Sequence, residues 1–360
     1  MRDSAGVRVV EIGAPPRARL VADLVQAPLE LSALPSPPHE IVAWKARPRG
    51  GFLLAEADGR VSLWHDDGAL EAAWGGAGEG PGEFRMIADV ATDPDGTLRI
   101  LDPVNVRVTR TTSVGAVLHS WQMASPWHRA ARLVPGGYVA AGPASDQTPP
   151  EPGYRRRPHD VVFVREAGEG VEHLTRTPGY GAYRVGVEDG RSVVANFAFV
   201  HPTLFAASDM HFATDRADGF VLGLHRRDGS LQTVIDATRL DRSIPAGEIE
   251  AAFARAEDRW GAPATHRMRG QIASALERVR PPIGALLFST DGEELWVGLA
   301  PAWRDEPPTH WWVFDTAGRP LFELALPPVH RLMSVDGDRL FAVAVDGVGV
   351  ERPVLLTMER

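Results

Sequence analysis

The chain has 360 residues, a formal net charge of −9, 44% hydrophobic residues and no cysteine. The lack of cysteine excludes disulfides, thiolate metal sites and cysteine nucleophiles. The acidic balance argues against nucleic acid as a partner, because phosphate binding needs a basic face. No apolar run reaches the roughly 18 residues that span a bilayer, so we expect no transmembrane segment.

The N-terminal region predicts short extended segments. Residues 7–12 alternate loosely between apolar and polar and could form a strand. A second extended segment lies within residues 19–34, with Leu29 and Leu31 on one face. Pro35, Pro37 and Pro38 then mark a linker.

From residue 39 onward the clearest signal is the spacing of tight turns. One set of turns, each between two apolar runs, fits the connection of first to second strands in a four-stranded meander. They are Gly50-Gly51, Asp95-Gly96, Gly136-Gly137, Ser208-Asp209, Asp291-Gly292 and Asp336-Gly337. Turns that fit the connection of third to fourth strands are Asp67-Gly68, Val114-Gly115, Glu169-Gly170, Asp228-Gly229 and Ala317-Gly318.

Six turns of the first kind against five of the second predict a six-bladed β-propeller whose last blade lacks a fourth strand. A strand near Leu29–Leu31 would close the ring and remove both open edges. We therefore expect one all-β domain over 1–360. The blades fall at about 39–75, 85–123, 128–176, 199–236, 283–326 and 330–358.

One segment departs from the β pattern. Within about 245–280, apolar residues including Phe253 and Trp260, and later Met268 and Ile272, recur at helical spacing. Gly261-Ala262-Pro263 separates the two halves. We expect a helical hairpin inserted between blades four and five.

A glycine-rich loop and a following polar pattern carry a family resemblance. The loop Gly78-Glu79-Gly80-Pro81-Gly82-Glu83-Phe84 is followed by Asp102, Asn105 and Arg107. This resembles an NHL repeat, with its glycine-rich loop and D-x-x-N-x-R pattern. The whole chain resembles NHL-like bacterial six-bladed propellers, which are usually exported and mostly of unassigned function. The resemblance implies that Asp102 and Asn105 brace the loop.

The start of the chain supports the same resemblance. Residues 2–11 look like the beginning of mature members of that group. We therefore expect an extracytoplasmic protein, in the periplasm or at the cell surface, whose leader is not part of this sequence.

Topology predicts where function would lie. The two kinds of tight turn share one face of the propeller, while the longer connections gather on the opposite, loop-rich face. Functional residues concentrate on loops held by a rigid scaffold. We therefore expect any site at the mouth of the central channel on the loop-rich face.

Histidines are the first candidates for that site. His128, His201 and His330 each precede the first strand of a blade, and Trp127 could add an aromatic floor for a ligand. Three histidines at the mouth would suit a metal such as zinc. The plainer interpretation is that each one caps a strand or bonds a loop, since no H-x-x-x-H spacing occurs.

Carboxylates are the second candidates. Six of them are expected at connections between second and third strands: Glu56, Asp58, Asp102, Asp215, Asp218 and Asp346. They could bind calcium. Calcium-dependent propeller hydrolases resemble this layout but also use asparagine ligands, and this chain has only Asn105 and Asn196.

Two function hypotheses remain open. The first is a non-catalytic scaffold that holds a protein or small ligand on the loop-rich face, either as a monomer or as an extrinsic subunit of a membrane-bound assembly. The second is a metal-dependent hydrolase or lyase at the channel mouth. Metal content would discriminate between them.

Overall fold

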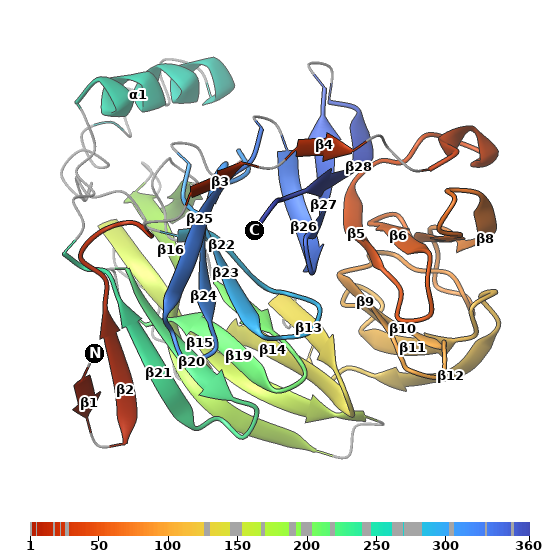
Figure 1. The fold of residues 1–360 in the computed structure, drawn as a ribbon, viewed down its shortest axis with the longest axis horizontal. Coiled ribbons are helices and arrows are strands. Elements are labelled where there is room, and N and C mark those ends of the chain that lie inside the picture. The colour runs from red at the N-terminus through yellow and green to blue at the C-terminus, as the bar shows by residue number, and fades with distance from the viewer. Residues whose placement is uncertain are drawn as a thin grey trace.

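The computed structural model describes residues 2–4, 6–16, 19–21, 23–25, 29–125, 130–144, 153–166, 170–186, 192–195, 204–216, 220–239, 246–260, 269, 283–301, 306–327, 330–346 and 349–360. Its strands form six sheets that follow one another around a ring (Figure 1). The chain is therefore an all-β, six-bladed propeller, as the turn spacing predicted. No helix of the described residues is long and apolar enough to cross a membrane.

The first three blades are built from consecutive strands. Blade one contains β5 (Ile41–Ala46), β6 (Phe52–Glu56), β7 (Arg60–Trp64) and β8 (Leu70–Gly75). Blade two contains β9 (Asp89–Thr92), β10 (Leu98–Asp102), β11 (Arg107–Thr111) and β12 (Val117–Gln122). Blade three contains β13 (Ala130–Val134), β14 (Gly137–Pro143), β15 (Gly153–Arg165), β16 (Val171–Gly186) and β17 (Ser192–Ala195).

The last three blades each combine consecutive strands with pieces of the N-terminal segment. Blade four contains β18 (Phe205–Ala207), β19 (His211–Asp215), β20 (Val221–Arg226) and β21 (Leu231–Asp236), with β1 (Arg2–Ser4) and β2 (Val7–Glu11). Blade five contains β22 (Ile283–Phe288), β23 (Glu294–Leu299), β24 (His310–Asp315) and β25 (Pro320–Ala325), with β3 (Arg19–Val21). Blade six contains β26 (His330–Asp336), β27 (Arg339–Val345) and β28 (Glu351–Thr357), with β4 (Asp23–Val25).

Asp-Gly turns set the hairpins of the blades. Gly96 and Gly229 have φ of 86° and 87°, a region that glycine enters without steric cost. The preceding aspartate fixes each turn from the other side. Asp95 Oδ1 accepts a bond from the Thr97 amide at 2.9 Å, and Asp228 Oδ1 accepts one from the Ser230 amide at 2.9 Å. Local chemistry therefore sets the hairpins before any blade packs.

The first strands of the blades line the propeller axis. Each of β5, β9, β13, β18 and β22 contacts the first strand of the next blade, and β26 of blade six contacts β5 of blade one. The ring is therefore complete at the level of its inner strands.

The N-terminal segment runs along the outer edges of three blades. β2 pairs in parallel with β21, with Val9 opposite Val234, and β3 pairs in parallel with β25. β4 then pairs antiparallel with β28, with Leu24 opposite Leu356. The strand beside β28 is thus Asp23–Val25. The position near Leu29–Leu31 that the sequence suggested was wrong, because Leu31–Ala33 form a 3-10 helix.

Blade three carries an extension that the sequence did not predict. The sequence placed blade three at about 128–176, yet β16 runs on to Gly186 and pairs there with the early part of β15. Arg155 pairs with Ala182 and Arg157 with Tyr180, and β17 pairs with the far end of β16. The arginine run at 155–157 therefore belongs to a β-hairpin.

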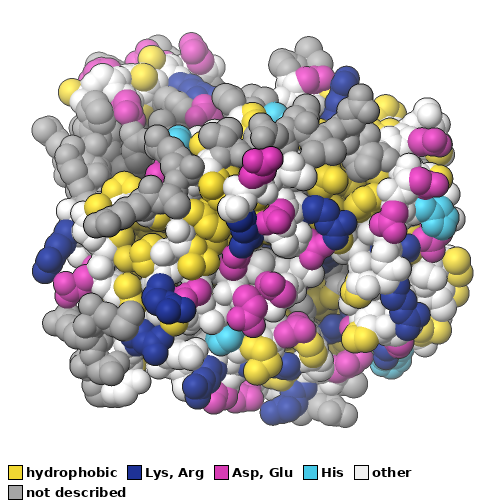
Figure 2. Space-filling model, viewed as in Figure 1, with side chains coloured by type: hydrophobic (Ala, Val, Ile, Leu, Met, Phe, Trp, Pro, Cys, Tyr) yellow, Lys and Arg dark blue, Asp and Glu magenta, His cyan; other side chains and the backbone are white. Residues whose placement is uncertain are grey.

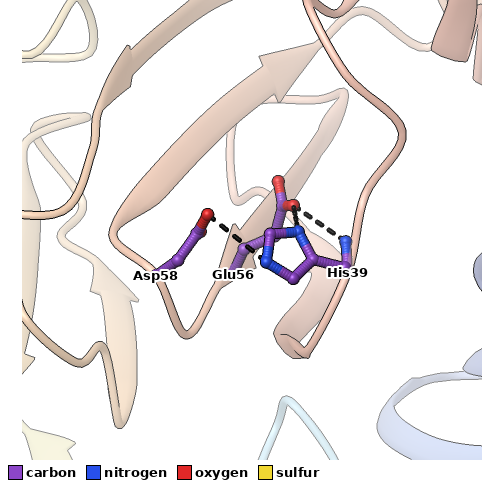
Figure 3. Close-up of side chains that lie close together, drawn as sticks. All are labelled: His39, Glu56 and Asp58. Atoms are coloured by element: carbon purple, nitrogen blue, oxygen red, sulfur yellow. Dashed lines mark hydrogen bonds and ion pairs between the residues drawn. The ribbon is translucent and has the colours of Figure 1, made fainter.

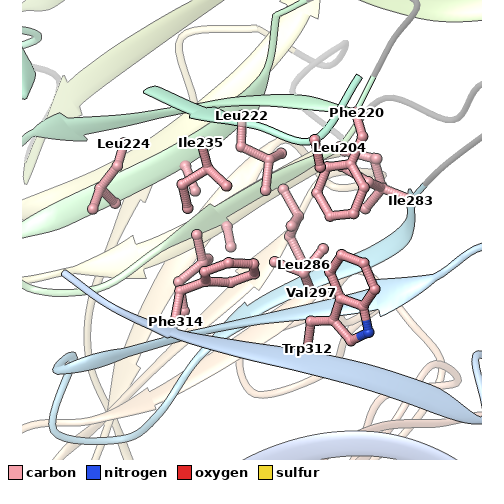
Figure 4. Close-up of a cluster of buried hydrophobic side chains, with 14 of the residues drawn as sticks. Leu204, Phe220, Leu222, Leu224, Ile235, Ile283, Leu286, Val297, Trp312 and Phe314 are labelled. Carbon is pink, nitrogen blue, oxygen red and sulfur yellow. The ribbon is translucent and has the colours of Figure 1, made fainter. Parts of the chain in front are cut away.

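The core lies between the blades, because both faces of each blade pack against a neighbour. Between blades four and five, Leu222 and Ile235 face Val297, Phe314 and neighbouring apolar residues (Figure 4). Trp312 packs in this cluster and is 4% exposed, whereas the adjacent Trp311 packs between blades five and six and is 1% exposed. Adjacent residues on one strand are thus buried on opposite faces.

The helix α1 (Ala246–Trp260) lies between β21 and β22 in the chain. It buries Ala252 and Phe253, while Glu250 and Arg255 on its other side are exposed. The described part of α1 therefore turns Phe253 inward. The second half of the predicted helical hairpin lies outside the described residues, apart from Arg269.

Candidate functional site

The loop-rich face is shaped by buried carboxylates at the ends of second strands. Glu56 ends β6, Asp102 ends β10 and Asp215 ends β19, and none is more than 4% exposed. Buried carboxylates are costly unless donors or cations satisfy them. The donors that surround each one therefore decide what it can do.

Asp102 is surrounded by donors of its own blade and of the glycine-rich loop. Its Oδ1 accepts bonds from the amides of Val104 at 3.1 Å and Asn105 at 3.0 Å. Its Oδ2 accepts the Arg85 amide at 2.8 Å and Asn105 Nδ2 at 2.8 Å. Asp102 therefore fixes the turn after β10 and the segment at Arg85 that leads into β9.

Asn105 and Arg107 hold the glycine-rich loop against the blade. Asn105 Nδ2 also donates to the carbonyl of Gly78 at 2.9 Å. Arg107 donates to the carbonyls of Glu79 at 2.8 Å and Gly80 at 2.9 Å, and to that of Glu83. The three residues of the D-x-x-N-x-R pattern thus act together as a brace.

Asp215 lies in a different contact, between blades three and four. Thr177 Oγ1 of β16 donates to Asp215 Oδ1 at 2.9 Å and to its backbone carbonyl at 3.0 Å. Both residues are buried. The geometry joins the end of β19 to the neighbouring blade.

A cluster of potential metal ligands lies at the loop-rich end of blade one. His39, Glu56 and Asp58 place one ligand atom each within 4.8 Å of one another (Figure 3). His39 Nδ1 lies 3.6 Å from Glu56 Oε2, and His39 Nε2 lies 3.5 Å from Asp58 Oδ2. This is the one such group of three among the residues that the structure describes.

Arg60 argues against a cation in this cluster. Its guanidinium donates to both oxygens of Glu56, from Nε at 2.5 Å and from Nη2 at 2.6 Å. Arg60 therefore compensates the cost of burying the Glu56 carboxylate. The hydrogen bond to Glu56 in turn raises the pKa of Arg60. A metal would have to displace that arginine. Calcium also prefers six or more oxygen ligands, which a set containing a histidine does not supply.

The backbone beside this cluster is strained. Glu40 has φ of 46°, which is uncommon for a residue other than glycine, and its carbonyl accepts the Ala57 amide at 2.9 Å. The amides on either side bind carboxylates: His39 N donates to Glu56 Oε2 at 2.9 Å and Ile41 N to Glu351 Oε2 at 2.5 Å. Two blades thus hold this entry into β5 in a fixed shape.

Glu351 belongs to the junction between blades six and one. Arg331 Nη2 donates to Glu351 Oε1 at 2.9 Å and to the Ile41 carbonyl at 2.9 Å. His330, a predicted site residue, precedes Arg331 at the start of β26 and is partly buried. It therefore lies on the inner strand that contacts β5.

The described structure brings only some of the other predicted site residues together. Trp127, His128 and His201 lie outside the described residues, so the three-histidine hypothesis stays a prediction. Asp102, Asn105 and Arg107 are neighbours in blade two, whereas Asp215 ends β19 of blade four and contacts Thr177 of blade three. Asp218 is also outside the described residues.

Sequence reasoning missed His39, Arg60 and Glu351. Glu56 and Asp58 were named as candidates, but their partners come from a preceding linker, from the next strand and from blade six. The signal available was the Glu56-x-x-x-Arg60 spacing across a strand connection.

The tight-turn face also has a feature that the sequence did not predict. A solvent-open hollow lies between blades five, six and one, with Arg47, Asp66, Thr290, Asp336 and Arg339 among its lining residues. Its charged residues pair within the protein, as Arg47 does with Glu71 at 2.6 Å. On the face shown in Figure 2, acidic and basic side chains lie intermingled near the middle.

Comparisons with known proteins give no family. No protein-family model and no curated protein matches the chain. A Bacteroides fragilis protein described as exported aligns with a TM-score of 0.49 and 12% identity, over 98% of this chain and 99% of that one. Regucalcin, a calcium-binding protein from Agrobacterium tumefaciens, aligns with a TM-score of 0.48 and 11% identity, over 98% and 95% of the two chains.

A third similar structure is the PQQ-bound aldose sugar dehydrogenase of Streptomyces coelicolor. It has a TM-score of 0.46 and 13% identity, over 96% of this chain and 100% of that one. Likenesses this distant carry no argument about activity, and a fold hosts many functions. The six sheets define a six-bladed propeller, and function has to be argued from the residues.

Proposed function

We propose that this protein is a non-catalytic binding scaffold that holds a protein or a small ligand on its loop-rich face. One observation carries the proposal. The buried carboxylates of that face are occupied by protein donors: Asp102 by the blade-two turn, Glu56 by Arg60 and Asp215 by Thr177. Such bonds fix loops in place, and a preorganised surface binds with a smaller loss of conformational entropy.

The finer parts of the proposal rest on particular contacts. The brace formed by Asp102, Asn105 and Arg107 supports an NHL-like type of blade. The pairing of β4 with β28 supports ring closure by the N-terminal segment. The place of α1 between β21 and β22 supports an insertion between blades four and five. Location outside the cytoplasm, as a monomer or an extrinsic subunit of a membrane-bound assembly, completes the proposal.

A matched pair of bait proteins tests the scaffold. The loop-rich variant Asp58→Lys/Glu79→Lys changes side chains that are 43% and 73% exposed. The control variant Asp209→Lys/Met210→Lys changes the opposite, tight-turn face, where Met210 is 68% exposed. We expect a partner retained by the wild-type bait to be lost from the loop-rich variant and kept by the control. Equal loss from both, or no retained partner or ligand, would contradict the scaffold.

The second candidate is a metal-dependent hydrolase or lyase, and the His39, Glu56 and Asp58 cluster is the observation that favours it. His39 and Asp58 would be the accessible ligands, because Arg60 occupies Glu56. Zinc or calcium bound in a one-to-one ratio, and lost on His39→Ala, would support this enzyme. Metal content that is unchanged by that substitution would remove its main support.

A further inference from the structure

Lys45 is the only lysine among the 38 basic residues of the chain. It lies on β5, the inner strand of blade one. Every other basic side chain of the sequence is an arginine or a histidine. Arginine stays protonated in proteins, whereas a lysine can lose its proton when it is removed from water. The one amine side chain is thus placed at the propeller axis.

Three inner strands meet at Lys45. Its Nζ donates to the carbonyl of Val90 on β9 and lies 3.9 Å from Asp89 Oδ1. Asp89 Oδ2 accepts the amide of Leu133, on β13, at 2.8 Å. The side chains of Lys45 and Asp89 are 28% and 17% exposed, so both are partly open to solvent.

Removal from water favours the neutral amine. It is the largest effect and lowers the pKa of Lys45 below 10.5; Asp89 opposes it, while Arg132 and Arg99 add to the lowering. Arg99 is itself held by Asp93, with Nη2 2.8 Å from Oδ1, and by the Val134 carbonyl. Arg132, one residue before Leu133, is exposed. The neutral amine that this partial removal from water favours is the form of lysine that acts as a nucleophile.

We propose that Lys45 Nζ binds a small 2-oxo acid covalently, as an imine, at the propeller axis. The nitrogen lone pair attacks the carbonyl carbon, and the carbonyl electron pair moves to oxygen. The two protons of the amine nitrogen pass in turn through Asp89 to the carbonyl oxygen: the first gives the carbinolamine hydroxyl, and the second converts that hydroxyl into water. Water then leaves as the C=N bond forms. The step is reversible and needs no oxidant or reductant. Arg132 supplies the positive charge for the substrate carboxylate.

This inference does not depend on the scaffold proposal, because it concerns the axis and not the loop-rich surface. Reductive trapping tests it directly. The folded protein is incubated with pyruvate and sodium cyanoborohydride, and the adduct is located by peptide mass mapping. The terminal α-amino group is the internal reference, since its ordinary pKa is about 7.7–8.0.

The expected result is an adduct at Lys45 that forms faster in the folded chain than in the urea-unfolded chain. At neutral pH the neutral fraction rises roughly tenfold for each unit by which the pKa falls. Adduct formation at the terminal amine alone, or a Lys45 rate that is no greater in the folded chain, would overturn the proposal. This comparison needs no variant, so a folding defect cannot obscure it.

Three substitutions assign the roles. Lys45→Arg keeps the positive charge and should abolish the internal adduct. Asp89→Asn keeps an oxygen for the Leu133 amide and should slow the adduct at least several-fold, with a changed pH profile. Arg132→Gln should slow trapping of pyruvate and leave trapping of the uncharged acetone unchanged. Equal effects on pyruvate and acetone would show that Arg132 does not read the carboxylate.

Discussion

Asn105 Nδ2 donates to Asp102 Oδ2 at 2.8 Å and at the same time to the carbonyl of Gly78 at 2.9 Å. The side-chain amide of Asn105 thus links the end of β10 to Gly78, which lies 27 residues before Asn105 in the chain. Removing either residue should therefore destabilise the same loop. If the two residues were metal ligands, removing either one would instead lower the amount of bound metal. The two interpretations of these residues can therefore be separated by experiment.

Asp102→Ala should destabilise the protein by about 3 kcal/mol, because it leaves buried amide donors without acceptors. Asp102→Asn should cost less, since one oxygen remains. Urea unfolding gives both values. We expect metal content to be unaffected by either substitution. Loss of a stoichiometric metal, with little change in stability, would instead assign Asp102 to a metal site.

Gly82→Val should cost on the order of 1–3 kcal/mol through backbone strain. Gly82, which follows Pro81, has φ of 78°. A Cβ there would meet only ordinary contacts, the nearest being Val117 Cγ2 at 3.7 Å, so the cost comes from the backbone. Gly13→Val is the control, because Gly13 has open space and no positive φ. Thermal unfolding that shows equal losses for both would contradict the strain argument.

Stability should fall in mild acid because of His225. This ring is 4% exposed and stacks on Phe212 with centroids 4.6 Å apart. Burial lowers the pKa of His225 below 6.5, and Arg216 lowers it further. The unfolded chain therefore takes up this proton more readily than the folded chain. The free energy of unfolding should decrease as the pH falls below 6.5.

His225→Gln isolates that contribution, because an amide can replace the contact to the Gly229 carbonyl at 3.2 Å and does not titrate. The variant should lose less stability than the wild type between about pH 7.5 and about pH 5.5, roughly one unit on either side of the ordinary histidine pKa. Urea unfolding at the two pH values measures the loss. His119→Gln, on an exposed ring, is the control. A wild-type slope in His225→Gln would assign the acid sensitivity to other groups.

Deleting residues 1–34 should lower the melting temperature by on the order of 10 °C and promote aggregation, because three outer strand edges lose their partners. Deleting residues 1–5 removes only β1, which pairs with β2 alone, and should have little effect. Light scattering and thermal unfolding measure both deletions. If the protein that lacks residues 1–34 is monomeric and as stable as the full chain, this segment does not close the ring.

The blades were predictable because their turns are local. Asp95-Gly96 and Asp228-Gly229 mark hairpins whatever surrounds them, and their glycines have the expected φ. Edge strands such as β3 and β4 are three residues long and carry no such signal. Their positions depend on pairing with strands more than 300 residues away, as for Leu24 and Leu356.

The candidate site was predictable only where its partners are close in sequence. Asp102 and Asn105 are separated by three residues, and their role as a brace follows from the motif. Ile41 and Glu351 are separated by 310 residues, and only the closed ring brings them together. The hairpin of blade three was missed for a related reason: Gly179, Gly181 and Pro158 favour loops locally, but pairing of β15 with β16 overrides that preference.

The pairing of β4 with β28 also sets an order of events at the ribosome. Residues 23–25 leave the ribosome long before their partners at 355–357. The N-terminal segment must therefore wait, unpaired, while five blades emerge and fold. A nascent chain that stalls before blade six cannot complete the ring. Its outer edges would stay open to chaperones or to neighbouring chains until the last strand is released.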